Sequence, residues 1–124
     1  MTKLLHVDDD DDIREVTKIA LEIFDDFELM QCASGEEALR AVGEFIPDVL
    51  LLDVMMPGLT GPQTLEKIRM MPGLAEVPVI FLTARTATDE NKELWDLGAL
   101  EVMNKPFDPM LLSQQIKTAL DRLS

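Results

Sequence analysis

Short apolar segments alternate along the chain with longer stretches in which apolar residues recur at steps of three and four. The short segments are typical of buried β-strands and the longer stretches of amphipathic helices. The predicted strands are residues 3–7, 28–32, 49–52, 79–82 and 101–104. Segment 49–52 is continuously apolar, which is typical of a central strand covered on both faces. The alternation predicts an α/β fold with a parallel sheet.

The first two predicted helices follow the first two strands. The apolar face predicted for the first helix consists of Ile13, Val16, Ala20, Ile23 and Phe24. The second begins at a capping box, in which the Ser34 hydroxyl and the Glu37 carboxylate each accept a hydrogen bond from a backbone N–H. We expect this second helix to reach about residue 45.

Proline and glycine punctuate the remaining helices. Pro62 suits the first turn of a third helix that reaches about residue 70, and Gly98 suits the left-handed position after a fourth helix at 88–97. For the last helix we expect Asp108 as the N-cap and Pro109 in the first turn. Its predicted buried face is Leu112, Ile116, Ala119, Leu120 and Leu123.

Composition narrows the class of protein. The chain has 124 residues, 47% of them apolar, which predicts one domain, residues 1–124, with a single core. A net charge of -13 at pH 7 argues against direct binding to nucleic acid or anionic membranes and favours cations or basic protein surfaces. The lone Cys32 cannot form an internal disulfide, and the apolar run at the start is too short for a signal peptide or a membrane span. We therefore expect a cytoplasmic location without membrane insertion.

Polar residues that could bind a ligand or take part in a reaction follow four of the predicted strands. Asp8 and Asp9 follow the first, Asp53 the third, Thr83 the fourth and Lys105 the fifth. The carboxyl ends of parallel strands lie at one edge of the sheet, where open α/β folds bind ligands. Carboxylates, a hydroxyl and an ammonium at that edge point to phosphoryl chemistry.

The carboxylates predict a cation at this edge. Two carboxylates about 4 Å apart repel by roughly 4 kcal/mol at an effective dielectric constant of about 20. A retained proton or a hard cation such as Mg²⁺, with Mn²⁺ as an alternative, relieves the repulsion. The other aspartates of the run, residues 10–12, suit the start of a helix, where the helix dipole favours negative charge. A calcium loop of the EF-hand type does not fit, because its required Gly and Glu are Ile13 and Ile19 here.

Four motifs carry a resemblance to a known family. They are Val7-Asp8-Asp9, Leu52-Asp53 with Met56-Pro57-Gly58 and Gly61, Leu82-Thr83-Ala84, and Lys105-Pro106-Phe107. Together they resemble the receiver domain of two-component response regulators, in particular stand-alone receivers like the chemotaxis regulator. The resemblance implies a doubly wound, flavodoxin-like fold with five parallel strands in the order 2-1-3-4-5 and helices on both faces.

The resemblance also implies a role for each metal-binding residue. Asp53 looks like the phosphoacceptor, which takes a phosphoryl group from the phosphohistidine of a histidine kinase or a histidine phosphotransfer protein. Asp9 and Asp53 would bind Mg²⁺ directly, Asp8 would bind it through water, and the carbonyl oxygen of Met55 would complete the set. Such a domain is a phosphoprotein that catalyses only its own phosphorylation and dephosphorylation, not an enzyme with an external substrate.

Phosphoryl binding and switching are implied in the same way. Thr83 and Lys105, with the backbone N–H groups of Met55 and Ala84, would hold the phosphoryl oxygens. Movement of Thr83 would then alter the surface of the fourth helix and fifth strand, where an unknown downstream protein binds, in a monomer or in a phosphorylation-dependent dimer. Val102 stands where many receivers have Tyr or Phe, so the readout of the switch differs here. The family usually has a cis peptide before the proline that follows Lys105.

Two alternatives remain open at this stage. A phosphohydrolase of the haloacid dehalogenase type has a second aspartate two residues after the first, and Met55 occupies that position here. A pseudo-receiver would keep the fold and bind partners without phosphorylation. The chain stops soon after the last helix, so we expect action through protein contacts alone or excision from a longer protein. His6 and Cys32 are expected to be packing residues, and Trp95 to fill a helix face.

Overall fold

A computed structural model describes residues 1–23, 26–84 and 88–123, with the side chains of residues 88–90 left out. The strands are β1 (Thr2–Val7), β2 (Phe27–Cys32), β3 (Val49–Asp53), β4 (Val79–Thr83) and β5 (Glu101–Asn104). The helices are α1 (Asp11–Glu22), α2 (Gly35–Ala41), α3 (Gly61–Arg69), α4 (Thr88–Asp96) and α5 (Leu112–Asp121). Strands and helices thus alternate along the chain, as the sequence predicts.

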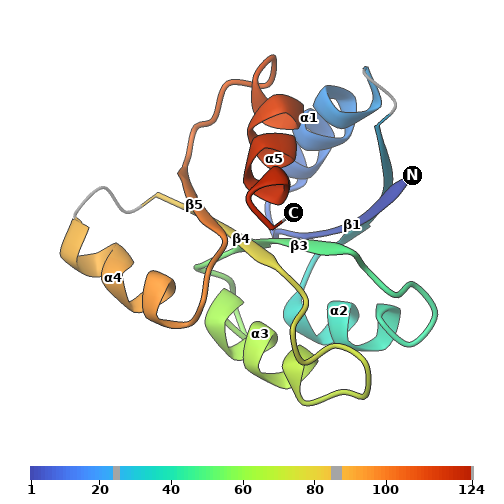
Figure 1. Cartoon of the computed structure of the whole chain (residues 1–124), viewed down its shortest axis with the longest axis vertical. Coiled ribbons are helices and arrows are strands. Elements are labelled where there is room, and N and C mark those ends of the chain that lie inside the picture. The colour runs from blue at the N-terminus through green and yellow to red at the C-terminus, as the bar shows by residue number, and fades with distance from the viewer. Residues whose placement is uncertain (24–25, 85–87, 124) are drawn as a thin grey trace.

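All neighbouring strands are parallel, in the order β2-β1-β3-β4-β5. Helices α1 and α5 cover one face of the sheet, and α2, α3 and α4 cover the other (Figure 1). This arrangement confirms the doubly wound α/β fold. The winding reverses between β1 and β3, which are paired neighbours with Val7 opposite Leu52. The residues that follow these two strands are therefore brought side by side at the place where such folds bind ligands.

The central strand β3 belongs to two cores at once. Leu50 and Leu52 pack into the cluster under α2 and α3, whereas Leu51 packs into the cluster with α1 and α5. All five residues of β3 are buried. Its continuously apolar sequence is therefore explained by a strand covered on both faces, and this rigid centre fixes the position of Asp53 at its end.

The predicted buried face of α1 is partly wrong. Ala20 is buried as predicted, but Val16 and Ile23 are exposed, and the helix also buries Thr17 and Leu21. The helix has two apolar stripes, and the one that packs includes a threonine, which a search for apolar periodicity does not count. The predicted Phe24 lies outside the described residues.

Two helix boundaries differ from the prediction, whereas α3 has Pro62 in its first turn and ends at Arg69, as predicted, with a capping box formed by Thr60 and Gln63. Helix α2 ends at Ala41 rather than near residue 45. Asp108 does not cap α5: its carboxylate accepts a hydrogen bond from the N–H of Met110 in an earlier turn, and α5 begins only at residue 112. Asp108 and Pro109 thus belong to a turn that precedes the helix.

Side chains near two helix ends also correct the prediction. Leu123 is exposed rather than part of the α5 face, because α5 ends at residue 121. In α4, Leu94 is buried, but Trp95 is 44% exposed, so Trp95 does not fill a packed helix face. Gly98 has the expected positive φ of 86° after α4. Within the described residues, no helix combines the length and apolar content needed to cross a bilayer.

Candidate functional site

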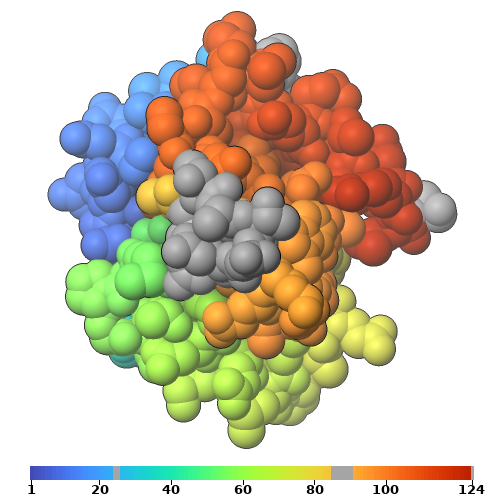
Figure 2. All heavy atoms as spheres, turned by 90° about the vertical axis from the view of Figure 1, so that its left-hand side faces the viewer, coloured from blue at the N-terminus to red at the C-terminus, as the bar shows by residue number. Residues whose placement is uncertain are grey.

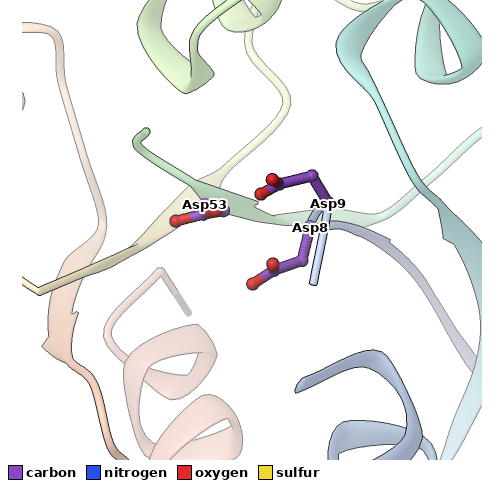
Figure 3. A group of neighbouring side chains, drawn as sticks. All are labelled: Asp8, Asp9 and Asp53. Carbon is purple, nitrogen blue, oxygen red and sulfur yellow. The ribbon is translucent and has the colours of Figure 1, made fainter. Parts of the chain in front are cut away.

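Three carboxylates converge at the carboxyl edge of the sheet. One side-chain oxygen from each of Asp8, Asp9 and Asp53 lies within 4.8 Å of the others. The side chains of Asp9 and Asp8 extend above and below the segment after β1, and their carboxylates are turned to the same side as that of Asp53 at the end of β3 (Figure 3). Figure 2 shows this end of the molecule, with the segments after β1 in blue, after β3 in green and after β5 in orange around it. The structure therefore brings together residues that are far apart in the sequence.

The aspartate run divides into two groups with different tasks, as predicted. Asp8 continues the edge of β1, because its N–H donates to the carbonyl oxygen of Cys32 at 3.1 Å, and its Oδ1 accepts from the N–H of Asp10 at 2.9 Å. Asp9 is exposed next to it. Asp10 is the N-cap of α1, accepting hydrogen bonds from the N–H groups of residues 12 and 13. Asp8 is thus held rigidly, while Asp9 is open to solvent.

Asp53 is the last residue of β3 and lies against the start of α3. Its side chain is almost buried, with 5% of the residue exposed. Gly61 lies directly behind it, and a Cβ at that position would be 2.4 Å from the carbonyl oxygen of Asp53. The N–H of Gly61 donates to the carbonyl oxygen of Val54 at 2.9 Å, which closes the loop. Only glycine permits this close approach of α3 to the site.

Lys105 joins two of the carboxylates. Its Nζ lies 2.8 Å from Oδ2 of Asp8 and 2.9 Å from Oδ1 of Asp53. Its own N–H donates to the carbonyl oxygen of Thr83 at 2.8 Å, which ties the segment after β5 to the end of β4. The peptide bond between Lys105 and Pro106 is cis, as the resemblance implies. The side chain is 17% exposed, so the ammonium is largely removed from water.

The charges of the site shift one another's pKa. Burial raises the pKa of Asp53 from 3.8 to about 6; the hydrogen bond from Lys105 opposes this rise, and the charge of Asp8 adds to it. For Lys105, burial lowers the pKa, but the hydrogen bonds to Asp8 and Asp53 outweigh burial and the net shift is upward. At neutral pH, Lys105 is therefore charged, and Asp53 is mostly ionised yet less hydrated than a surface carboxylate.

The remaining predicted site residues lie at the same edge. Thr83 ends β4 and is buried, with β4 pairing next to β3 so that Leu82 is opposite Asp53. Ala84 follows it and is exposed. Met55 follows β3, and its side chain is 63% exposed. All the predicted site residues are thus near the ends of the strands that the sequence indicates.

His6 is a neighbour of the site that was not predicted from the sequence. His6 is fully buried, as expected of a packing residue, but its Nε2 lies 4.0 Å from Oδ2 of Asp8. Its Nδ1 is 3.1 Å from the amide nitrogen of Gln31. Burial, followed by the charges of Lys105 and Arg14, lowers the pKa of His6 to about 3, so the ring is neutral. Strand periodicity could have predicted this neighbour, because the side chains of residues 6 and 8 lie on the same face of the sheet.

The donor set fits a hard divalent cation. Three carboxylates supply only oxygen ligands, which suit Mg²⁺, and the oxygens are close enough to share one ion. A single ammonium faces these three carboxylates among the described residues, so the cluster keeps an excess of negative charge. An added cation would compensate that excess.

Comparison with known sequences agrees with this geometry. The profile of the family described as "Response regulator receiver domain" matches residues 4–117. The transcriptional regulatory protein CseB of Streptomyces avermitilis is 40% identical over 98% of this chain and 50% of that protein. Response regulator Rre1 of Synechocystis sp. is 34% identical over 96% of this chain and 52% of that protein. The chain therefore spans about half the length of these curated relatives.

Solved structures of similar proteins have the same fold. Chemotaxis protein CheY4 of Vibrio cholerae superimposes with a TM-score of 0.88 at 31% identity, over 96% of this chain and 98% of that one. A CheY-like receiver domain protein of Methanospirillum hungatei gives a TM-score of 0.82 at 29% identity, over 98% of this chain and 95% of that one. The strand order and the helices on both faces are thus those of a known group of signalling proteins.

Proposed function

Because the chain belongs to the response regulator receiver family, we propose that Asp53 accepts a phosphoryl group from the phosphohistidine of a histidine kinase or a histidine phosphotransfer protein. Receiver domains are signalling domains that histidine kinases phosphorylate and that act on downstream partners. The observation that carries the proposal is the contact of Asp53 with Lys105 within a cluster of three carboxylates. We treat residues 1–124 as one such domain in the cytoplasm.

Asp53 is the best nucleophile of the three carboxylates. Burial raises its pKa to about 6, so the ionised form is poorly solvated and reactive, yet predominant at neutral pH. Asp8 has both oxygens engaged, Oδ1 by the N–H of Asp10 and Oδ2 by Lys105. Asp9 is exposed, so water solvates its charge. Asp53 combines low solvation with a position at the centre of the edge.

The proposed step is a direct transfer between two residues. An oxygen of Asp53 forms a bond to phosphorus as the P–N bond to the donor histidine breaks, and the bonding electron pair stays on the imidazole nitrogen, which is then protonated. Such a transfer needs mainly positioning and neutralisation of charge on the phosphoryl oxygens. Lys105 supplies an ammonium to one of these oxygens, and the hydroxyl of Thr83 and the N–H groups of Met55 and Ala84 supply further donors.

The carboxylates also define where a cation would be held. Receiver domains generally bind Mg²⁺ at an acidic pocket, and we assign Asp9, Asp53 and the carbonyl oxygen of Met55 as its direct ligands, with Asp8 acting through water. Mn²⁺ suits the same oxygen set. When bound, the cation supplies positive charge to the carboxylates and to the phosphoryl oxygens.

The output is proposed to pass through α4 and β5. Thr83 ends β4, and the neighbouring strand β5 carries Val102 opposite Phe81, so a movement of Thr83 toward the phosphoryl group reaches this region through β4. Val102 occupies the position where many receivers have Tyr or Phe, so a change of its side-chain conformation moves a smaller volume than the rotation of a Tyr ring. A downstream protein, or a second copy in a phosphorylation-dependent dimer, binds this surface, without direct contact to nucleic acid.

Intact mass measurement tests the proposal. The protein is incubated with acetyl phosphate and Mg²⁺, and the expected result is the mass of one added phosphoryl group. The adduct is expected to be absent in Asp53→Asn and in the presence of a chelator. If no adduct forms, even with a competent kinase as donor, the chain is a receiver fold that binds partners without phosphorylation.

A further inference from the structure

His6 points toward the acidic cluster from within β1. Residues 6 and 8 lie on the same side of the strand, and Nε2 of His6 is 4.0 Å from Oδ2 of Asp8. Both side chains are fully buried. Among the described residues, Nε2 has no hydrogen-bond partner. A buried imidazole nitrogen without a partner is costly unless another state of the protein supplies one.

Gln31 determines which nitrogen of His6 carries the proton. Its amide nitrogen donates to the carbonyl oxygen of Arg14 at 2.7 Å and lies 3.1 Å from Nδ1 of His6. An amide nitrogen has two hydrogens and no acceptor capacity, so it donates to both atoms. Nδ1 must then accept, and the neutral ring carries its proton on Nε2. That N–H faces Asp8.

Asp8 depends on Lys105 for one of its two hydrogen bonds. Oδ1 of Asp8 is held by the N–H of Asp10, and Oδ2 is held by Nζ of Lys105 at 2.8 Å. In the proposed reaction, Lys105 turns toward the phosphoryl oxygens, and Oδ2 of a fully buried carboxylate loses this donor. Loss of a donor to a buried charge is strongly unfavourable.

We propose that His6 is a positioning residue that donates its Nε2–H to Oδ2 of Asp8 when Lys105 turns to the phosphoryl group. The inference rests on the proposed function. The two atoms need to approach by only about 1 Å to reach hydrogen-bond distance, which a small rotation of either side chain achieves. Asp8 thereby keeps its orientation toward the cation before and after phosphorylation. The competing explanation is that His6 only fills space in the core.

Nitrogen-15 NMR of the imidazole tests the contact directly, because the chain has one histidine and its signals need no further assignment. The unphosphorylated protein is expected to show the tautomer protonated at Nε2. Addition of acetyl phosphate and Mg²⁺, with the adduct verified by mass in the same sample, is expected to move the Nε2–H proton downfield. An adduct without this change overturns the inference and leaves the proposed function intact.

The variant Lys105→Met tests the same contact without phosphorylation. Removal of the ammonium frees Oδ2 of Asp8, so the folded Lys105→Met variant is expected to show the downfield shift of the Nε2–H proton without phosphorylation. In the double variant Lys105→Met, Asp8→Asn, this shift is expected to be smaller. If the wild-type protein forms no phosphoryl adduct, the proposed function is wrong, but the Nε2–H resonance of Lys105→Met still tests the contact between His6 and Asp8. A Nε2–H resonance that is the same as in wild type overturns the inference.

Two substitutions of His6 separate positioning from packing. In His6→Val, the Mg²⁺ affinity of the unphosphorylated protein is expected to stay unchanged, because Lys105 still holds Asp8, while the rate constant of phosphorylation by acetyl phosphate falls about 10-fold. In His6→Gln, an amide N–H near the position of Nε2 is expected to restore most of that rate. Equal rates for the Val and Gln variants at equal thermal stability would indicate a packing role only.

Discussion

Nζ of Lys105 lies 2.9 Å from Oδ1 of Asp53, although Asp53 ends β3 and Lys105 follows β5, two strands that are separated in the sheet by β4. The contact therefore spans the end of β4, where Thr83 lies. It brings one positive charge to the carboxylate whose pKa burial raises to about 6. The ammonium favours the ionised form of Asp53 and leaves it poorly hydrated, which is the state that the proposed transfer needs.

Replacement of Lys105 by methionine is expected to destabilise the fold. Two largely buried carboxylates, Asp8 and Asp53, would face each other without their ammonium. We expect the free energy of unfolding at neutral pH, in chelator, to fall by about 2–3 kcal/mol, less than for a fully buried pair because Asp53 can bind a proton. Chemical denaturation followed by circular dichroism measures this loss.

Two controls distinguish the site from a general loss of charge. Lys117→Met removes a partly exposed ion pair with Asp26 and is expected to cost less than about 1 kcal/mol. Adding Asp53→Asn to Lys105→Met is expected to recover part of the lost stability, because one of the opposing charges is gone. Additive effects of the two substitutions would contradict the coupling.

The stability difference between wild type and Asp53→Asn is expected to depend on pH. The pKa of Asp53 is about 6 in the folded protein, and we take its ordinary value of 3.8 for the unfolded chain. Between these two pH values the native state therefore binds up to one proton more than the unfolded state. In chelator, the free energy of unfolding of wild type minus that of Asp53→Asn should therefore fall as the pH rises from 3.8 to 6, by at most about 3 kcal/mol. A difference that is flat or rises with pH would contradict the raised pKa.

Asp9→Ala is expected to weaken Mg²⁺ binding. Asp9 is exposed and is one of the three clustered carboxylates, so loss of its side chain removes a metal ligand while disturbing little packing. We expect the Kd from calorimetric titration to rise at least about 10-fold, which is the lower end of the loss seen when even an outer partner of a metal ligand is removed. Asp12→Ala, in the same run but in the first turn of α1, is the matched control with unchanged affinity.

Gly61→Ala is expected to disturb Asp53 from behind. The new Cβ would lie 2.4 Å from the carbonyl oxygen of Asp53, so α3 or the end of β3 must shift. We expect a loss of at least about 1 kcal/mol of unfolding free energy together with slower phosphorylation. Gly43→Ala meets its nearest atom at 3.5 Å and is expected to be neutral or stabilising by a few tenths of a kcal/mol. Equal stability of the two variants would rule out the close approach.

The sequence predicted the fold and the location of the site because both depend on local signals. Residues 49–52 are continuously apolar, and this pattern alone indicated a central strand ending at Asp53. Once the strands were parallel, the sheet edge at which Asp8, Asp53 and Lys105 meet followed from topology. The strand order itself came from the family resemblance, since strand periodicity does not contain it.

What the sequence did not predict depends on contacts between distant segments. Val16 was expected to be buried in α1, but the helix packs through Thr17 instead, because the shape of the sheet selects between its two stripes. Gly61 stands in the sequence only as part of a family motif, whereas its role is set by its close approach to the backbone of Asp53. The position of His6 beside Asp8 likewise depends on Gln31 from β2.

Chemical trapping of the acyl phosphate tests the central claim most directly. The protein is phosphorylated with acetyl phosphate and Mg²⁺, then reduced with borohydride, which converts a phosphorylated aspartate to homoserine, and its peptides are sequenced by mass spectrometry. The account predicts homoserine at residue 53. Homoserine at residue 8 or 9, or phosphorylation elsewhere with residue 53 unchanged, would contradict it.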